Sequence, residues 1–198
     1  MFSASILAVV LVYTWILAPV TPKWTVGVVT LLVVGLAVAR ALKSGEWGLK
    51  GRSFLPALAW SAAFTVFAAL VLYLAGAGLR TWHETPNVWG TLIVLVPWGL
   101  GQQFALQTTF LREAQRVTSK RGGLWLAALM FAALHLPNPL LALVTGVAAA
   151  VWCWIYDRYP NVLPLALSHA LLTLAILSAF DQRITGHLKV GAAYLSLR

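Results

Sequence analysis

Long apolar segments with few charged residues constrain the fold of this chain more than any other feature. An α-helix of roughly 20 apolar residues crosses the hydrocarbon core of a bilayer. Because lipid offers no water to the backbone, a spanning segment must satisfy its N–H and C=O groups internally. The sequence therefore predicts an all-α polytopic membrane bundle with about seven, or at most eight, transmembrane helices. Bounded by charge, proline or glycine, the seven segments cover about 2–20, 24–42, 54–78, 88–111, 118–136, 139–156 and 162–180.

The composition agrees with this class. Hydrophobic residues make up 61% of the chain and charged residues 10%, whereas soluble domains are roughly half apolar and a quarter charged. Seven spans with their connectors use the 198 residues, so we expect one integral membrane domain over 1–198 and no separate soluble domain. The first segment lacks a basic start and is longer than the core of a signal peptide, which indicates a retained helix.

The charge distribution predicts the orientation in the membrane. A net charge of +9 could indicate nucleic acid, but the basic residues fall in short connectors, so we expect no nucleic-acid partner. The positive-inside rule places the two most basic connectors and the N-terminus in the cytoplasm, and the compact size favours a prokaryotic plasma membrane. These connectors hold Arg40, Lys43, Lys50 and Arg52, and then Arg112, Arg116, Lys120 and Arg121.

A few polar side chains lie inside the apolar segments and mark where chemistry is expected. Gln102, Gln103 and Gln107 interrupt the fourth segment, whereas His135 closes the fifth and His169 lies in the seventh. Such groups are costly in lipid, so they usually face a protein interior or a watery cavity. Each also has a structural interpretation, because intramembrane polar side chains form interhelical hydrogen bonds worth roughly 0.6–2 kcal/mol.

Spacing and local breaks group these residues further. Pro97 and its neighbouring glycines are expected to kink the fourth segment and open space beside the glutamines. The uncharged connector 135–139 could dip into the membrane as a re-entrant turn and carry His135 deeper. Residues four apart share a helix face, and three such pairs are Gln103 with Gln107, Phe131 with His135, and His169 with Thr173.

Three sequence blocks, at 102–112, 131–138 and 161–173, resemble the motifs of the CPBP family. The second reads Phe-x-x-x-His followed by Leu-x-Asn, and the third is a proline-containing helix entry that leads to a late histidine. This family comprises type II CAAX prenyl proteases and bacteriocin-processing intramembrane proteases. The resemblance covers about 45–180, with the site-forming helices in 88–180. It implies an enzyme in which a glutamate activates water, the first histidine assists, and the late histidine and an asparagine stabilise the oxyanion.

The first block departs from the family pattern. Gln102 and Gln103 stand where the family has two adjacent glutamates, Gln107 where it has arginine, and Thr173 where asparagine is usual. A carboxamide can orient water but cannot accept its proton. Losing the anions also removes the reason to bury a compensating cation. The resemblance thus implies catalytic positions at His135, His169, Gln102 and Gln103, with supporting or substrate-binding positions at Gln107, Thr173, Phe131 and Asn138.

Two enzyme chemistries remain open for such a site. In one, His135 or His169 is the general base, because imidazole suits proton transfer near neutral pH. In the other, the histidines bind a metal that acidifies its water. Two histidines without a carboxylate or thiolate make a poor zinc site, so we expect no metal and no cofactor. A carboxylate could also replace the family glutamate that is absent at position 102. The candidate is Glu84, whose connector could fold over the opening of the expected site.

The resemblance therefore implies an intramembrane endopeptidase that cleaves a membrane-associated peptide. An alternative is a non-catalytic pseudoprotease that holds a hydrophobic peptide, a transmembrane segment or a lipidated tail, because binding requires no base. A third is a structural membrane subunit in which the polar residues only join helices. Membrane lipids are expected partners in each case.

Overall fold

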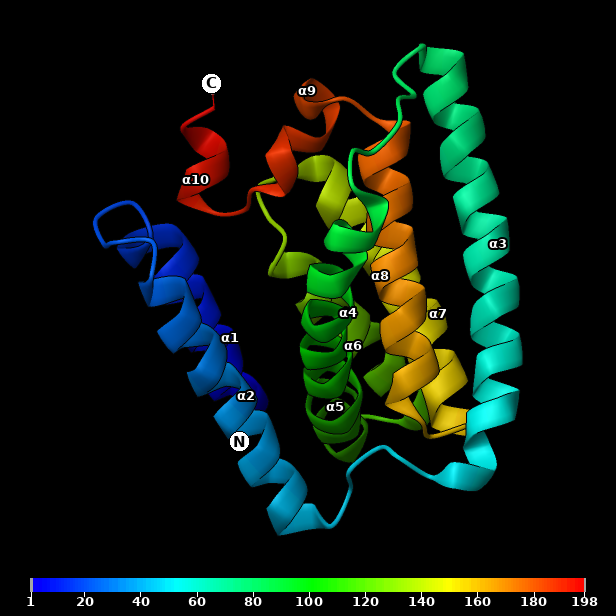
Figure 1. The fold of residues 1–198 in the computed structure, drawn as a ribbon. Helices are drawn as coiled ribbons and strands as arrows, with labels where there is room; N and C mark the ends of the chain where they lie inside the picture. Colours follow the sequence, from blue (N-terminus) through cyan, green and yellow to red (C-terminus); the bar gives the residue numbers. More distant parts are fainter. Residues whose placement is uncertain (1, 198) are drawn as a thin grey trace. The chain divides into compact units, whose positions relative to one another are not determined.

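The computed structural model describes residues 2–197, and these residues are mainly helical (Figure 1). Within this part of the chain, β-type pairing is confined to one isolated bridge between Leu49 and Asn161. The predicted all-α architecture is therefore confirmed. The elements are α1 (Phe2–Val12), η1 (Tyr13–Leu17), α2 (Thr25–Ser44), η2 (Gly51–Ser53), α3 (Phe54–Leu79), α4 (Val88–Phe104), η3 (Ala105–Leu111), α5 (Arg112–Val117), α6 (Lys120–Ala133), α7 (Pro139–Arg158), α8 (Val162–Ala179), α9 (Gln182–Thr185), η4 (Gly186–Leu188) and α10 (Ala192–Leu195).

Each of the seven predicted segments contains a helix, but the helices differ in length. Four are long and apolar enough to cross a membrane by length and composition, namely Thr25–Ser44, Gly51–Leu79, Pro139–Arg158 and Val162–Ala179. The helix within 118–136 is shorter than predicted, because α6 has 14 residues, or about 21 Å at 1.5 Å per residue. The Ser119 hydroxyl caps its start by accepting the Gly122 N–H at 2.9 Å. The number of complete spans stays a prediction.

The contacts divide the described residues into two compact units, and each is described by itself. Unit 1 contains residues 2–47, 104–153 and 188–197, and unit 2 contains residues 48–103 and 154–187. In unit 1, α1 and α2 lie side by side and run in opposite directions (Figure 1). The short α6 packs against α5 and the π-helical segment η3, which also contacts α2.

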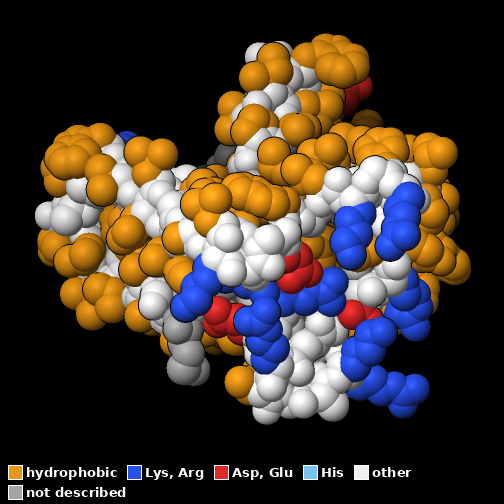
Figure 2. Space-filling model, turned by 90° about the horizontal axis from the view of Figure 1, so that it is seen from below, with side chains coloured by type: hydrophobic (Ala, Val, Ile, Leu, Met, Phe, Trp, Pro, Cys, Tyr) orange, Lys and Arg blue, Asp and Glu red, His pale blue; other side chains and the backbone are white. Residues whose placement is uncertain are grey.

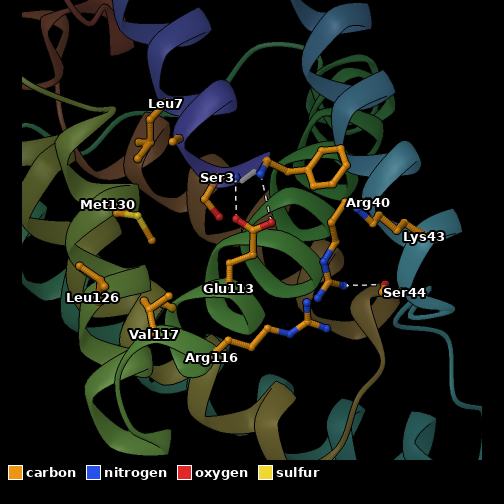
Figure 3. Close-up of a pocket in the computed structure, with 13 residues that line it drawn as sticks. Ser3, Leu7, Arg40, Lys43, Ser44, Glu113, Arg116, Val117, Leu126 and Met130 are labelled. Carbon is orange, nitrogen blue, oxygen red and sulfur yellow. Dashed lines mark hydrogen bonds between the residues drawn. The ribbon is translucent and has the colours of Figure 1, made fainter.

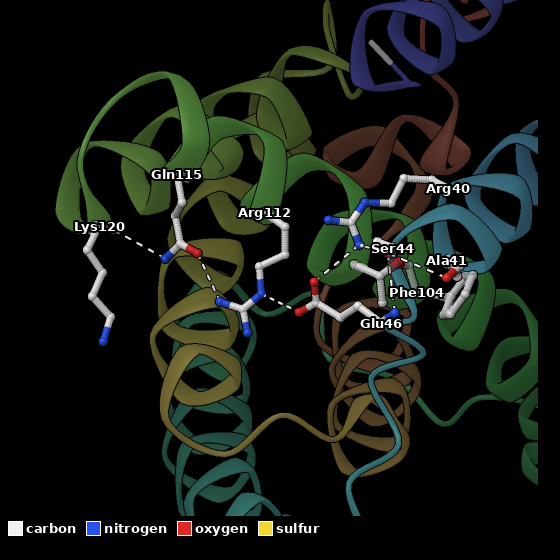
Figure 4. Close-up of polar contacts among 9 residues, drawn as sticks. Arg40, Ala41, Ser44, Glu46, Phe104, Arg112, Gln115 and Lys120 are labelled. Atoms are coloured by element: carbon white, nitrogen blue, oxygen red, sulfur yellow. Dashed lines mark hydrogen bonds and ion pairs between the residues drawn. The ribbon is translucent and has the colours of Figure 1, made fainter.

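A chain of charged contacts joins the end of α2 to the start of α5 within unit 1 (Figure 4). One oxygen of Glu46 lies 3.2 Å from Arg40 Nη1, and the other accepts a hydrogen bond from Arg112 Nε at 2.5 Å. Arg112 Nη1 then donates to Gln115 Oε1 at 2.9 Å. Because Glu46 contacts two guanidinium groups, it cannot be removed without leaving both short of a partner.

The first helix is held by a carboxylate from another part of unit 1. Glu113 of α5 accepts the backbone N–H groups of Phe2 at 3.1 Å and Ser3 at 2.9 Å. The first N–H groups of a helix have no partner within the helix, and its N-terminus favours a negative charge. Burial raises the pKa of Glu113, but the hydrogen bonds from Ser3 and Phe2 outweigh it and hold the pKa below its ordinary value of 4.5.

In unit 2, α3 runs along α8 (Figure 1), and small and hydroxyl side chains allow a close approach. The buried Thr65 hydroxyl donates to the Ser168 hydroxyl at 2.7 Å. At the far end of α3, Thr81 Oγ1 donates to the backbone oxygen of Ala179 at 2.8 Å. Gly76 faces the same carbonyl so closely that a Cβ atom would collide with the backbone of Ala179. The interface therefore depends on the missing side chain at Gly76.

We expect Gly76→Ala to lower the free energy of unfolding by about 1–3 kcal/mol, because the added methyl must push α3 away from α8. Gly78→Ala is the matched control, since a Cβ at Gly78 meets no atom within 4 Å. That change should be neutral or slightly stabilising, because alanine favours helix over glycine. Unfolding of the detergent-solubilised chain measures both variants, and equal stability of the two would contradict the close packing.

The Glu113 cap makes a contribution to stability that depends on pH. Because its pKa is lowered on folding, the contribution is complete above the ordinary pKa of 4.5 and is lost as the pH falls through the lower folded value. We expect Glu113→Gln to cost about 1–2 kcal/mol at pH 7, since hydrogen bonds to charged groups are worth roughly 1.5–3 kcal/mol before solvent screening.

The measurement is the unfolding midpoint of the chain between pH 7 and pH 3. Glu113→Gln should flatten the acid limb of this curve, whereas Glu84→Gln, which removes an exposed carboxylate, should leave it unchanged. An acid limb that persists in full in Glu113→Gln would show that other groups cause it.

Candidate functional site

Unit 2 holds a buried pair that joins two of the predicted site residues. Gln103 on α4 is fully buried and His169 on α8 is 7% exposed. Gln103 Nε2 lies 3.2 Å from His169 Nδ1. An amide nitrogen only donates hydrogen bonds, so Nδ1 is the acceptor and the neutral ring carries its proton on Nε2. His169 is therefore oriented to donate from Nε2.

The close approach of α4 to α8 rests on a glycine one turn before Gln103. A Cβ atom on Gly99 would lie 3.0 Å from the backbone oxygen of Ala166 and 3.5 Å from Cβ of His169. Beyond the histidine, Thr173 Oγ1 donates to the backbone oxygen of His169 at 2.9 Å. The threonine at the family's asparagine position thus bonds to its own helix.

The other two glutamines lie on either side of a change in helix type. Gln102 Oε1 is buried and accepts no hydrogen bond from the described residues. Gln107 is fully buried within η3, a π-helical segment whose seven residues, 105–111, are all buried. Pro97 lies within α4, and the helix becomes π-helical from Ala105. The kink at Pro97 stays a prediction. Single π-helical turns of this kind often occur at functional sites.

The second predicted histidine lies in unit 1, in the turn after α6. His135 Nδ1 is 2.7 Å from the backbone oxygen of Phe131, and the two rings are 4.9 Å apart between centroids. A carbonyl oxygen only accepts, so the proton of a neutral ring is on Nδ1 and the lone pair is on Nε2. A neutral His135 therefore presents its lone pair at Nε2, the nitrogen that does not bond to Phe131.

Asn138 in the same turn has a role that the sequence did not predict. Its Oδ1 accepts the Leu141 N–H at 3.1 Å, which caps the start of α7. Its Nδ2 donates to the backbone oxygen of Lys189 at 3.2 Å. Gly191 N–H also donates to the Leu136 oxygen at 2.8 Å. The C-terminal segment therefore holds the turn that carries His135.

The structure thus places the predicted residues in two local clusters. In unit 2, Gln103 contacts His169, and Thr173 bonds to the histidine backbone. In unit 1, Phe131 contacts His135. The convergence of all four residues at one site stays a prediction. Across residues 2–197, no three His, Cys, Asp or Glu side chains are grouped so that they could hold a metal ion.

The two tautomers can be measured by nitrogen NMR of the histidine side chains in the detergent-solubilised chain. We expect the proton of His169 on Nε2 and that of His135 on Nδ1, because their Nδ1 atoms contact a donor and an acceptor respectively. In Gln103→Glu an ionised carboxylate can only accept, so the proton of His169 should move to Nδ1 while His135 keeps its signals. A proton on Nδ1 of His169 in the unaltered chain would contradict this assignment.

Comparison with known families agrees with the sequence blocks. Residues 81–175 match the model of a family described as type II CAAX prenyl endopeptidase Rce1-like. The matched region contains the blocks at 102–112, 131–138 and 161–173, whereas the extension of the resemblance over 45–80 stays a prediction. No curated protein and no solved structure matches the chain.

Proposed function

We propose that this integral membrane protein, whose residues 81–175 belong to the Rce1-like family of type II CAAX prenyl endopeptidases, is an intramembrane endopeptidase with a histidine as its general base. The observation that carries the proposal is the hydrogen bond from His135 Nδ1 to the Phe131 oxygen. It leaves the basic nitrogen Nε2 free of the ring proton. In this chain Gln102 stands where the family has its catalytic glutamate. Proton transfer to and from the substrate therefore requires another group.

The proposed reaction divides the chemistry between the two histidines. Water attacks the peptide carbonyl carbon while His135 Nε2 takes up one of its protons. The carbonyl oxygen then carries a negative charge, and the family resemblance assigns its stabilisation to the late histidine, His169, through the Nε2–H. The proton held by His135 passes to the leaving amide nitrogen as the C–N bond breaks. Gln103 acts as a positioning residue, because its amide fixes the tautomer of His169.

The neutral amides predict a slow enzyme. General acid–base catalysis contributes typically about 10²–10⁴-fold to a rate, and an imidazole replaces only part of what a buried glutamate with a suited pKa supplies. The substrate class that follows from a membrane-embedded site is a peptide with a hydrophobic or lipidated segment.

A second function is favoured by the Gln103–His169 pair. Both side chains present hydrogen-bond donors in a buried setting, and a donor is what an exposed peptide carbonyl needs. Such a site could hold a hydrophobic peptide, a transmembrane segment or a lipidated tail without cleaving it. This non-catalytic function requires His169 but does not require a basic nitrogen on His135.

Cleavage by the full chain in phospholipid vesicles distinguishes the two functions. The probes are a prenylated peptide with a C-terminal CAAX sequence and a single-span hydrophobic peptide, each followed by mass spectrometry and by photo-crosslinking. We expect His135→Ala to lower turnover by about 10²-fold or more while crosslinking persists. His83→Ala is the matched control, because its Nδ1 also bonds to a backbone oxygen, that of Thr81 at 3.0 Å, but the residue is exposed.

Intact peptide that crosslinks equally to the unaltered chain and to His135→Ala, with no product in either, would overturn the protease and support the binding protein. Loss of crosslinking in His169→Ala would then assign the donor role. Turnover that survives His135→Ala but not His83→Ala would contradict both.

A further inference from the structure

Unit 1 contains a cavity of about 530 Å³ that none of the proposed catalytic residues lines. It lies where α1 begins, α2 ends, and α5 and α6 pass (Figure 3). Its lining changes character from one side to the other. Arg40, Lys43 and Arg116, with Ser44 and the carboxylate of Glu113, form a polar side, whereas Leu7, Leu126 and Met130 belong to an apolar wall.

The buried cation in this lining is Arg40, which is 2% exposed. Its Nη1 donates to Ser44 Oγ at 3.1 Å and to Glu46 at 3.2 Å. Its Nε and Nη2 are buried and have no hydrogen-bond partner among the described residues. A buried guanidinium with unused donors is costly unless an acceptor completes it.

The neighbouring charges do not supply that acceptor. Glu113 accepts the N–H groups of Phe2 and Ser3. Glu46 bonds only to Nη1 of Arg40 and shares its other oxygen with Arg112, while Arg116 brings a second guanidinium group to the lining of the same cavity (Figure 3). Lys43 adds a third cation to the same lining. Lys and Arg side chains are the most numerous charged groups in the view of Figure 2, with a few acidic groups among them.

The apolar wall indicates that a ligand of this cavity has a hydrocarbon portion as well as a charged group. Leu126 and Met130 are four residues apart on α6 and therefore share a helix face, and Leu7 of α1 lines the same cavity. An occupant with an anionic group and a hydrocarbon portion satisfies both sides. Basic pockets among membrane helices bind lipid head groups for this reason.

We propose that this cavity is a phosphate-binding site in which Arg40 and Arg116 hold the anionic oxygens and the leucines and Met130 contact an attached acyl chain. Guanidinium groups match phosphate oxygens with two parallel hydrogen bonds. The unused Nε and Nη2 of Arg40 form such a fork. An anionic phospholipid and free inorganic phosphate share this chemistry and differ in their use of the apolar wall.

Isothermal titration calorimetry of the full chain in a non-ionic detergent tests the site. The three probes are dioctanoyl phosphatidylglycerol, dioctanoylglycerol, which has the same acyl chains without phosphate, and sodium phosphate at matched ionic strength. We expect phosphatidylglycerol to bind and Lys43→Gln with Arg116→Gln to weaken it at least about tenfold. Both side chains are exposed, so this double variant does not depend on a change in the core.

Lys120→Gln with Arg121→Gln is the matched control, because it removes the same two charge types from exposed positions outside the cavity. It should change the affinity less than about twofold. Arg40→Lys keeps the buried charge but loses the fork, and it should weaken binding as much as the first double variant. If Arg40→Lys does not fold, the two double variants still decide the matter.

Tight binding of phosphatidylglycerol with no heat from dioctanoylglycerol or inorganic phosphate would support the site and identify a lipid as its source. Equal binding of inorganic phosphate would support the site with a free anion as its source. Equal affinity for dioctanoylglycerol, equal loss in both double variants, or absence of binding by all three probes would overturn the proposal.

Discussion

A polar group buried in the hydrocarbon of a membrane has no water molecule as a hydrogen-bond partner. This constraint explains most of the polar contacts in the described residues. Asn161 Oδ1 accepts the Leu163 N–H at 3.1 Å at the start of α8, and Asn138 does the same for α7. Hydroxyl groups bond to carbonyls of their own helix, as Thr173 does. Because unsatisfied groups in lipid cost several kcal/mol each, polar side chains in the spans bond to one another, as Gln103 and His169 do, or to the backbone of their own helix.

The exchange of glutamate for glutamine changes the site through the same constraint. A carboxylate beside His169 Nδ1 would accept its proton, whereas the Gln103 amide donates to it. The substitution thus turns a ring that could serve as a base into a ring that donates. Gln107, which stands where the family has arginine, is fully buried as a neutral side chain, and a buried arginine there would need an anionic partner.

Charges gather outside these segments, where they hold the ends of helices. Glu46 joins α2 to α5, Glu113 caps α1, and Asp181 Oδ1 accepts two N–H groups at 3.0 Å at the start of α9. These three of the five carboxylates therefore have structural roles. Arg40, Lys43 and Arg116 outnumber the one carboxylate, Glu113, in the lining of the cavity around Arg40.

The sequence by itself determined the class of the protein, the existence of its helices and the family of residues 81–175. These depend on hydrophobic length and on motif order, which are local along the chain. It also identified the polar positions, but not their partners.

Only the tertiary structure decided that Gln103 meets His169, that the C-terminal segment holds the turn at Asn138, and that Arg40 is buried with unused donors. It also showed that residues 105–111 form a π-helical segment. The amino-acid composition of these residues does not predict this change in helix type. The physical reason is that a hydrogen-bond partner is chosen by packing, and the residues that pair here lie 51 and 66 positions apart.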